Sequence, residues 1–323
     1  MPDHNAPRDT GEDASGTPPL IVLVGPTAVG KTALSLDLAE RVGGEIVNAD
    51  SRSFYRGMDI GTAKVSPAER DRVPHHLIDI LDPGDAVSLA TFQDLATAAI
   101  RDITARGRLP FLVGGTPQYV NALVEGWRIP RVEPDEAFRH DLERLAEAHG
   151  VAPLQERLAT VDPAAAAKIG TNLRRIIRAL EVYEKTGRPI SELQAKGPAP
   201  FRALELELWM PRDVLYPRID ARVDDQVARG LFDEIRGLLA QGVAPHAPSF
   251  SSIGYRQVLP YLRGEASADD VIARIKHDSH RLVRHQETWW RKNPRLVRID
   301  MAGVAPRDHA MRDIETHLHN RPQ

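Results

Sequence analysis

The tightest constraint on the fold is a phosphate-binding loop (P-loop) motif, G-x-x-x-x-G-K-T, which occupies residues 25–32. A short run of branched apolar residues at 20–24 precedes the motif and predicts a buried strand. Residues 31–42 repeat apolar side chains at helical spacing. A strand, a glycine-bearing turn and a helix are the context that this motif requires. Because backbone N–H groups and the helix N-terminus attract an anion there, we predict a bound di- or triphosphate.

Each part of the loop has a predicted task in holding that phosphate. The Lys31 ammonium can neutralise the terminal phosphate, and the Thr32 hydroxyl can coordinate Mg²⁺. A chance match in a glycine-bearing turn is the alternative, and the flanking strand and helix argue against it. The motif by itself leaves open which di- or triphosphate is bound. The candidate binding residues are Gly25, Pro26, Thr27, Ala28, Val29, Gly30, Lys31 and Thr32.

Alternating strands and helices extend the fold beyond the loop. Apolar runs predict strands at residues 45–49, 76–80 and 109–113, and residues 88–106 have the apolar spacing of a helix. Strands that alternate with helices form parallel sheets that are covered on both faces. We therefore predict an α/β fold of the P-loop NTPase type, with a parallel sheet at its centre.

The pattern changes after residue 126, and nearly the whole segment up to residue 200 has helical spacing. Residues 201–210 then alternate apolar and polar side chains, which predicts a return to the sheet. Helical spacing resumes over residues 213–293, and residues 295–299 predict one more strand. We therefore divide the chain into a P-loop core of residues 19–126 and 201–300 and a helical insertion domain of residues 127–200.

The ends of the chain and its composition add further expectations. Residues 1–18 are rich in Pro, Gly, Asp and Ser and predict a disordered tail, while residues 303–323 predict a polar, frayed tail. The chain has no cysteine, which excludes disulfides and thiolate metal sites. We find neither a membrane-helix run nor the apolar segment of a secretory signal. We therefore expect a cytoplasmic protein that does not contact a membrane.

Besides the P-loop, NTPases have an acidic residue at the end of another apolar strand, where it holds Mg²⁺. We find no clear counterpart of that residue in this sequence. The strand at residues 109–113 is followed by Gly114 and Gly115 rather than by a carboxylate. Asp79 and Asp82 follow an earlier apolar run but lie within the sequence I-D-I-L-D-P. The loop therefore suits a diphosphate that belongs to something other than a hydrolysed nucleotide. An ATP-dependent small-molecule kinase, or a nucleotide-binding switch, is the second hypothesis.

Asp50 is the candidate catalytic carboxylate. It follows the second predicted strand, and ligands of open parallel sheets bind at the carboxyl ends of the strands, so Asp50 should face the P-loop. A carboxylate in that place can accept a proton from an attacking nucleophile. The alternative is a structural role, since an Asp-Ser pair is also common at the start of a helix or turn.

Longer stretches of the sequence are more specific than the loop. Residues 50–64 read D-S-R-S-F-Y-R-G-M-D-I-G-T-A-K. They resemble the signature D-S-x-x-x-Y-x-G-[ML]-D-I-G-T-[AD]-K of the tRNA dimethylallyltransferases, also called tRNA isopentenyltransferases. The resemblance covers residues 20–298, and a kinase that shares only the P-loop would not carry the family's motifs in order. The other similar stretches are 74–79 (PHHLID), 114–119 (GGTPQY), 178–182 (RALEV), 254–257 (GYRQ) and 286–289 (QETW).

The resemblance implies a reaction and roles for individual residues. In this family the P-loop holds dimethylallyl diphosphate with the help of Mg²⁺. The acceptor is N6 of the adenosine immediately 3′ of the anticodon, in tRNAs that read codons beginning with U. Asp50 resembles the general base, and Thr27 and Thr116 are the other implied catalytic residues. The implied partners are dimethylallyl diphosphate and the tRNA anticodon stem-loop, bound by a monomer. The implied tRNA contacts are Asp50, Ser51, Arg52, Ser53, Thr116, Arg139, Arg174, Arg175, Arg178 and Arg256.

The chain departs from the family pattern at a few positions. Arg52 stands where many members have a small or aliphatic residue, and His285 stands where arginine is usual. The stretch at residues 251–253 is less basic than in some relatives. These differences concern the RNA contacts rather than the reaction. The lack of cysteine means that the zinc finger of the eukaryotic members is absent.

Two basic stretches offer a surface for RNA in a chain whose formal net charge is −3. Residues 274–298 hold eight Lys or Arg against two acidic residues, and residues 168–188 hold six against two. Solvated helix faces are the simpler explanation for such runs. A transferase that prenylates free AMP is a third hypothesis, but an acceptor that small needs no basic surface, so the runs favour tRNA. Either Trp289 or Trp290 could stack on a base, but we expect Trp289 in the core and Trp290 partly exposed.

Overall fold

The computed structural model describes residues 17–194 and 196–320. Within them lies a six-stranded sheet of order β3-β2-β4-β1-β5-β6, in which all neighbouring strands are parallel. The predicted α/β fold with a parallel sheet is confirmed. Most of the tail predicted at residues 1–18 lies outside the described residues. The strands are β1 (Pro19–Val24), β2 (Gly44–Asn48), β3 (His75–His76), β4 (Leu109–Val113), β5 (Arg202–Trp209) and β6 (Val297–Asp300).

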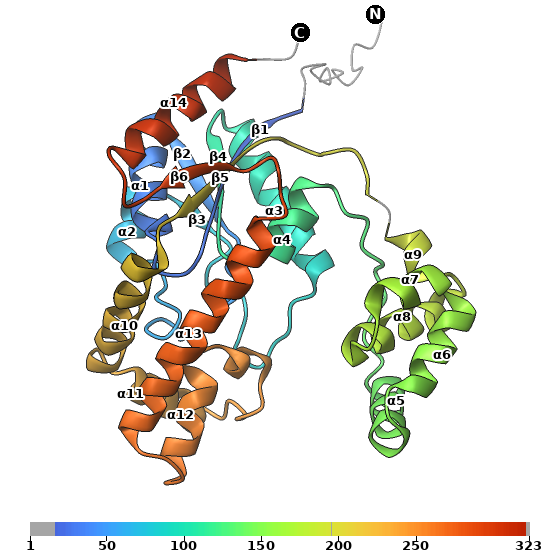
Figure 1. Cartoon of the computed structure of the whole chain (residues 1–323). Helices are drawn as coiled ribbons and strands as arrows, with labels where there is room; N and C mark the ends of the chain where they lie inside the picture. Colours follow the sequence, from blue (N-terminus) through green and yellow to red (C-terminus); the bar gives the residue numbers. More distant parts are fainter. Residues whose placement is uncertain (1–16, 195, 321–323) are drawn as a thin grey trace, which may run out of the picture.

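Helices cover both faces of the sheet (Figure 1). On one face, Ile21 and Leu23 of β1 share a core with α1 (Lys31–Val42) and α14 (Pro306–His319). On the other face, Leu20 and Val22 pack with α3 (Leu89–Ala105) and α4 (Pro117–Val124). A strand that is buried on both sides needs apolar side chains at consecutive positions, which explains the unbroken apolar run in this part of the sequence.

The strand predicted at residues 76–80 is wrong in extent. β3 ends at His76, because Leu77 (φ 61°) and Asp79 (φ 56°) adopt left-handed backbone that cannot continue a strand. The segment instead bonds to the residues around the end of β2. Asn48 Nδ2 donates to Leu77 O at 2.9 Å, and the Asp79 N–H donates to Ser53 O at 3.3 Å. The apolar pattern therefore belongs to a partly buried loop that follows β3. The short helix α2 (Pro67–Arg72) precedes β3 in the chain.

The frayed tail predicted for residues 303–323 is also wrong over residues 306–319. α14 is a regular helix, and its Ala310 and Ile314 are completely buried beside α1. The Arg202 guanidinium of β5 also donates to His317 O. The helix is mostly polar, and only this narrow apolar stripe, four residues apart, faces the core, so its composition resembles that of a solvated tail.

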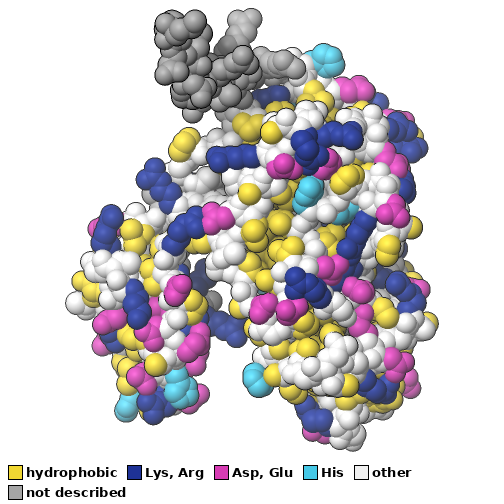
Figure 2. All heavy atoms as spheres, turned by 180° about the vertical axis from the view of Figure 1, so that it is seen from behind, with side chains coloured by type: hydrophobic (Ala, Val, Ile, Leu, Met, Phe, Trp, Pro, Cys, Tyr) yellow, Lys and Arg dark blue, Asp and Glu magenta, His cyan; other side chains and the backbone are white. Residues whose placement is uncertain are grey.

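The segment predicted to be a helical insertion forms a compact group of helices that stands apart from the sheet (Figure 1). It has a hydrophobic core of its own, which includes Leu142, Leu158 and Ile176. Figure 2 shows the same lobe from behind, with basic and acidic side chains interspersed on its surface. Its helices are α5 (Glu136–His149), α6 (Ala152–Val161), α7 (Pro163–Ile169), α8 (Leu173–Thr186) and α9 (Ile190–Leu193).

The two chain segments that lead into and out of this lobe run antiparallel and contact each other at two glycines. The Gly197 N–H donates to Gly126 O at 2.8 Å, and Trp127 and Lys196 form an isolated antiparallel bridge beside them. Gly126 has a φ of 59°, and a Cβ there would lie 2.5 Å from Pro198 O. A side chain at position 126 would therefore force the two segments apart.

The remaining helices form a second layer below the carboxyl ends of the strands. They share a hydrophobic core that includes Met58, Ile235 and Tyr255. The long helix α13 joins this core to the sheet, because Trp290 at its end is 1% exposed and packs on the β1 side chains. None of the helices in residues 17–194 and 196–320 is long and apolar enough to cross a bilayer. The elements of this layer are α10 (Arg212–Ala228), α11 (Leu231–Ala240), η1 (Pro248–Ser251), α12 (Tyr255–Leu262) and α13 (Ala268–Trp290).

Candidate active site

A cavity of about 870 Å³ lies at the carboxyl ends of β1, β2 and β4. Its walls are the P-loop, the loops after β2 and β4, and the facing sides of α10 and α13. This is the edge at which ligands bind in open parallel sheets. The sequence-predicted residues that line it are Thr27, Ala28, Gly30, Lys31, Thr32, Asp50, Ser51, Arg52, Ser53, Thr116 and Arg256.

The P-loop has the conformation expected of an anion cradle. Gly25 has a φ of 147°, and a Cβ there would meet Leu208 O of β5 at 2.4 Å. Gly30, with a φ of 107°, starts α1 without any side-chain cap. The first N–H groups of α1 therefore lack a capping side chain and can bind an anion. Val29 belongs to the hydrophobic core, so it supports the loop from behind rather than lining the cavity.

Lys31 lies inside the loop and donates to Gly25 O at 3.0 Å and to Pro26 O at 2.8 Å. Burial lowers the pKa of the Lys31 ammonium from its ordinary value of 10.5 to about 8, with a contribution from Arg222, while Asp50 opposes the shift. An ammonium that is desolvated beside another cation gains most from an anionic ligand. The site is therefore electrostatically prepared for a phosphate group.

Asp50 and Thr116 lie on neighbouring loops that contact each other. The Ser51 N–H donates to Thr116 Oγ1 at 3.4 Å, which joins the loop after β2 to the loop after β4. Asp50 Oδ1 accepts the Arg52 N–H at 3.0 Å, and Asn48 holds both the N–H and the carbonyl of Asp50. Within the described residues no hydrogen bond reaches Asp50 Oδ2. The carboxylate is thus held in place and keeps an oxygen available to a substrate.

Two arginines of α10 that the sequence patterns did not single out also line the cavity. Arg222 interacts electrostatically with both Lys31 and Asp50, and burial lowers the pKa of its guanidinium while Asp50 opposes that shift. Arg218, one turn earlier, donates to Ala28 O of the P-loop at 3.3 Å. Their spacing of four residues on a predicted helix is the signal that could have identified them.

Gln286 of α13 was also missed as a site residue, although it opens the Q-x-T-W motif. Its Oε1 accepts the Thr27 N–H of the P-loop at 3.2 Å, and its Nε2 donates to Gly115 O at 2.7 Å. A Cβ at Gly115 would lie 2.7 Å from that Nε2, so the glycine leaves space for the contact. Gln286 therefore fixes the P-loop and the loop after β4 relative to each other.

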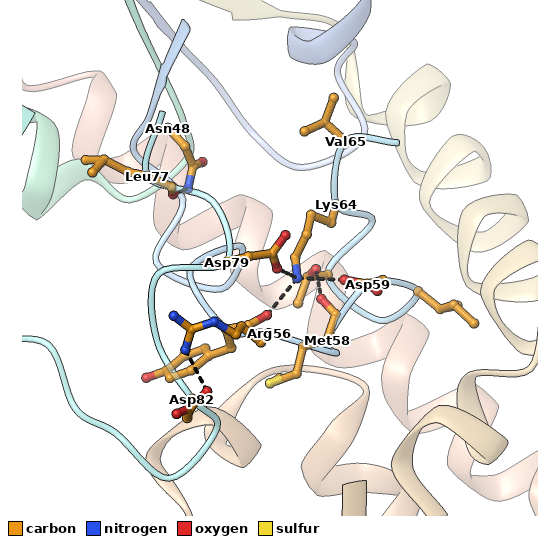
Figure 3. A network of polar contacts seen from close by, with 12 residues as sticks. Asn48, Arg56, Met58, Asp59, Lys64, Val65, Leu77, Asp79 and Asp82 are labelled. Atoms are coloured by element: carbon orange, nitrogen blue, oxygen red, sulfur yellow. Dashed lines mark hydrogen bonds and ion pairs between the residues drawn. The ribbon is translucent and has the colours of Figure 1, made fainter. Parts of the chain in front are cut away.

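Part of the signature at residues 50–64 builds the wall of the cavity. The Lys64 side chain is 1% exposed, and its Nζ donates at 2.6 Å to each of Tyr55 O, Asp59 Oδ1 and Asp79 Oδ1 (Figure 3). From the opposite side, Glu234 of α11 accepts the N–H groups of residues 59–61. These contacts explain why so many signature residues are not in direct contact with the cavity.

The arginines predicted to bind tRNA on the insertion fall into two groups. Arg139 and Arg178 both contact the fully buried Glu181, at 2.7 and 2.6 Å, so they form part of the lobe's own structure. Arg174 and Arg175 are exposed, and no carboxylate of the described residues lies within salt-bridge distance of either. The second pair is therefore the better candidate for contacts with RNA.

The expectation for the two tryptophans is reversed. Trp290 is 1% exposed and belongs to the sheet core, while Trp289 is 40% exposed and lines the cavity. Leu282 lies two turns before Trp289 on the same helix, lines the same cavity and is 38% exposed. The cavity therefore has exposed apolar side chains in its wall beside its charged residues.

Comparison with known proteins identifies the family. Residues 53–293 match the family model described as IPP transferase. The chain is 57% identical to the tRNA dimethylallyltransferase of Roseiflexus sp. (strain RS-1) over 282 residues, which are 87% of this chain and 92% of that protein. It is 56% identical to the tRNA dimethylallyltransferase of Thermomicrobium roseum over 88% of this chain and 86% of the relative.

Solved structures give the same result. The crystal structure of the tRNA isopentenylpyrophosphate transferase from Bacillus halodurans is 42% identical, with a TM-score of 0.72 over 95% of this chain and 98% of that one. A eukaryotic dimethylallyltransferase acting on tRNA is 29% identical, with a TM-score of 0.79 over 94% of this chain and 80% of that one. This chain therefore belongs to the tRNA dimethylallyltransferase (IPP transferase) family.

Proposed function

We propose that the chain transfers the dimethylallyl group of dimethylallyl diphosphate to N6 of the adenosine at position 37 of tRNA, immediately 3′ of the anticodon, in tRNAs that read codons beginning with U. The observation that carries the proposal is a single cavity that holds a P-loop lysine, a second, partly buried cation and a fixed carboxylate. These are Lys31, Arg222 and Asp50. The first two suit the leaving diphosphate, and the third suits the proton of the attacking amine.

The charges of the cavity fit the leaving group. As the bond between C1 and the diphosphate oxygen breaks, negative charge develops on the diphosphate. Lys31, Arg222 and the first N–H groups of α1 line the place where this charge appears. They stabilise the transition state more than the ground state, because the charge is greatest after the bond has weakened.

Asp50 supplies the complementary step. As the bond between N6 and C1 forms, the amine loses a proton, and the Asp50 carboxylate accepts it. The products are the N6-dimethylallyl adenosine, free diphosphate and a proton carried by Asp50. Thr116, whose hydroxyl accepts the Ser51 N–H, holds the loop that presents this carboxylate.

Mg²⁺ fits the same proposal. This ion prefers oxygen ligands and is commonly bound by few protein groups together with substrate phosphates. Thr32 lines the cavity next to Lys31 and offers a neutral hydroxyl oxygen, and the diphosphate would supply charged oxygens. When bound, the ion would neutralise charge on the leaving diphosphate.

An RNA acceptor is supported by the surroundings of the cavity. A base in an anticodon loop must leave its stack to reach Asp50, and exposed aromatic and apolar side chains can receive unstacked bases. Trp289 and Leu282 provide such a surface in the cavity wall.

The test is to incubate the protein with labelled dimethylallyl diphosphate and Mg²⁺ and to offer three acceptors in parallel. These are the anticodon stem-loop, the same stem-loop with guanosine in place of the target adenosine, and AMP. We expect label only in the first. Label in AMP alone, or in no acceptor, would reject the proposal. Transfer of phosphate from labelled ATP to a small molecule would instead support the kinase hypothesis.

A further inference from the structure

A second groove of about 620 Å³ adjoins the catalytic cavity, between the start of α12 and the middle of α13. The two share four lining residues, so the groove continues the cavity outward. On α13 the lining positions recur every three or four residues and form one face of the helix. The shared residues are Ile253, Arg256, Leu282 and His285, and the groove adds Gln257, Arg274, Asp278 and Arg281.

The groove is positively charged in a way that the basic run at residues 274–298 did not reveal. Several basic residues of that run are paired with carboxylates elsewhere: Lys276 with Asp224, Arg295 with Glu205, and Arg298 with Glu207. In the groove, by contrast, three arginines face one acidic residue. The run is therefore not a continuous basic surface, and its residues Arg274 and Arg281 are the ones that line the groove.

The one acidic residue of the groove pairs with two of the three arginines, so it neutralises only part of the groove's positive charge. The Asp278 side chain is 7% exposed and accepts Gln257 Nε2 at 2.7 Å. Arg256 and Arg274 reach it only at 3.4 and 3.3 Å, and their side chains are 52% and 63% exposed. A guanidinium has five N–H donors, so both arginines keep donors for another anion. No carboxylate in the described parts of the chain lies within salt-bridge distance of Arg281.

We propose that this groove binds the nucleotide next to the target adenosine in the anticodon loop, with a flanking phosphate held by Arg274 and Arg281. The inference rests on the proposed function, because it assumes an RNA acceptor. Three observations support it: the groove opens into the cavity that receives the target base, its charge is opposite to that of a phosphate, and Leu282 and Ile253 give it an apolar surface for a base or ribose.

The experiment combines a protein change with an RNA change. The variant Arg274→Gln with Arg281→Gln removes two charges from exposed side chains. The control, Arg291→Gln with Lys292→Gln, removes the same charge from exposed residues that line neither cavity. Binding is measured with the anticodon stem-loop over a range of salt concentrations. A second set of stem-loops carries a neutral methylphosphonate at one linkage flanking the target adenosine.

We expect the groove variant to bind the stem-loop more weakly and to lower the salt slope by roughly 0.7–0.9 for each phosphate that it no longer binds. It should show little further decrease in affinity for the stem-loop whose methylphosphonate replaces the bound phosphate, because the two changes remove one interaction. The KM for dimethylallyl diphosphate should stay unchanged. Arg281→Gln alone should lower the affinity for the stem-loop and the salt slope by about half as much. This single variant serves as the test if the double variant is unstable.

Equal decreases in affinity for the groove variant and the control, or additive decreases at every flanking linkage, would overturn the inference. Its failure can be told apart from failure of the proposed function. In the first case the wild-type protein still prenylates the unmodified stem-loop, whereas in the second case the wild-type protein transfers no label to it.

Discussion

The catalytic cavity and the helical insertion both place basic residues near a carboxylate, but with opposite results. In the insertion, Arg139 and Arg178 close around Glu181, whose side chain has no exposed surface. In the cavity, Lys31 and Arg222 act on Asp50 only at longer range, and the structure has no salt bridge among these three described residues. Arg139 and Arg178 are used in internal contacts of the insertion. Lys31 and Arg222 line the cavity without a salt bridge to Asp50 and are available to a ligand.

The difference shows that the number of charges does not identify a binding site. A buried carboxylate that is contacted by two arginines engages several of their donors and holds segments of chain together. Cations that lack a carboxylate partner and are partly desolvated bind an anion more strongly than the same groups in water. Substitutions in the two regions should therefore affect different measurements.

The largest effect is expected for Asp50→Asn. The substitution keeps the shape of the side chain and removes its capacity to accept a proton, so turnover should fall at least ~10²-fold. Binding of dimethylallyl diphosphate should stay nearly the same, as measured by calorimetry. If the affinity for dimethylallyl diphosphate falls as much as turnover, the role of Asp50 is structural, and the cavity does not differ from the insertion in the way described above.

A smaller effect is expected for Lys31→Ala. A hydrogen bond to a charged group contributes about 1.5–3 kcal/mol, so affinity for dimethylallyl diphosphate should fall roughly 10- to 100-fold. Binding of tRNA, measured separately by fluorescence anisotropy, should remain largely unchanged. Equal weakening of both substrates would indicate that Lys31 supports the whole site rather than the anion cradle.

A rise in pH should also weaken the binding of dimethylallyl diphosphate, without any substitution. The pKa of Lys31 is lowered to about 8, so its ammonium is present below that pH and is lost as pH rises through it. The affinity of the free enzyme for dimethylallyl diphosphate should therefore fall above about pH 8. The Lys31→Ala protein should lack this fall, and a fall that persists there would assign the titration to another group.

In the insertion, Glu181→Gln should reduce stability rather than chemistry. Breaking a buried ion pair from one side costs about 3–5 kcal/mol, and less where the partners are partly exposed, as Arg139 and Arg178 are. The midpoint of thermal unfolding should fall, while the KM for dimethylallyl diphosphate should not change. A raised KM for the diphosphate would show that the insertion and the cavity are energetically coupled.

The smallest effect is expected for the exposed arginines of α8. Arg174→Glu with Arg175→Glu should weaken tRNA binding and lower its salt slope by roughly 0.7–0.9 for each phosphate that these arginines bind in the wild-type protein. Arg178 is left intact because its reversal would also disrupt Glu181. Circular dichroism checks that the helix remains folded. Unchanged affinity and salt slope would show that these arginines form only a solvated helix face.

Local patterns in the sequence were enough to predict the elements at the centre of the molecule. The P-loop motif and its flanking apolar runs predicted β1, the loop and α1, and the position of Asp50 after β2 predicted its place in the cavity. Such features follow from short-range physics: consecutive apolar residues form a doubly buried strand, and glycines allow the turn that exposes N–H groups. The order of the family motifs indicated the reaction.

Tertiary structure decided what depends on a partner far along the chain. Trp289 and Trp290 are adjacent, and only the packing of α13 determines which of them enters the core. Arg178 and Arg174 share a helix, yet Glu181 engages only the first of them. Gln286 bonds to a P-loop residue 259 positions away. Periodicity shows which face of an element is apolar, but the partner of each polar side chain exists only once the elements have packed.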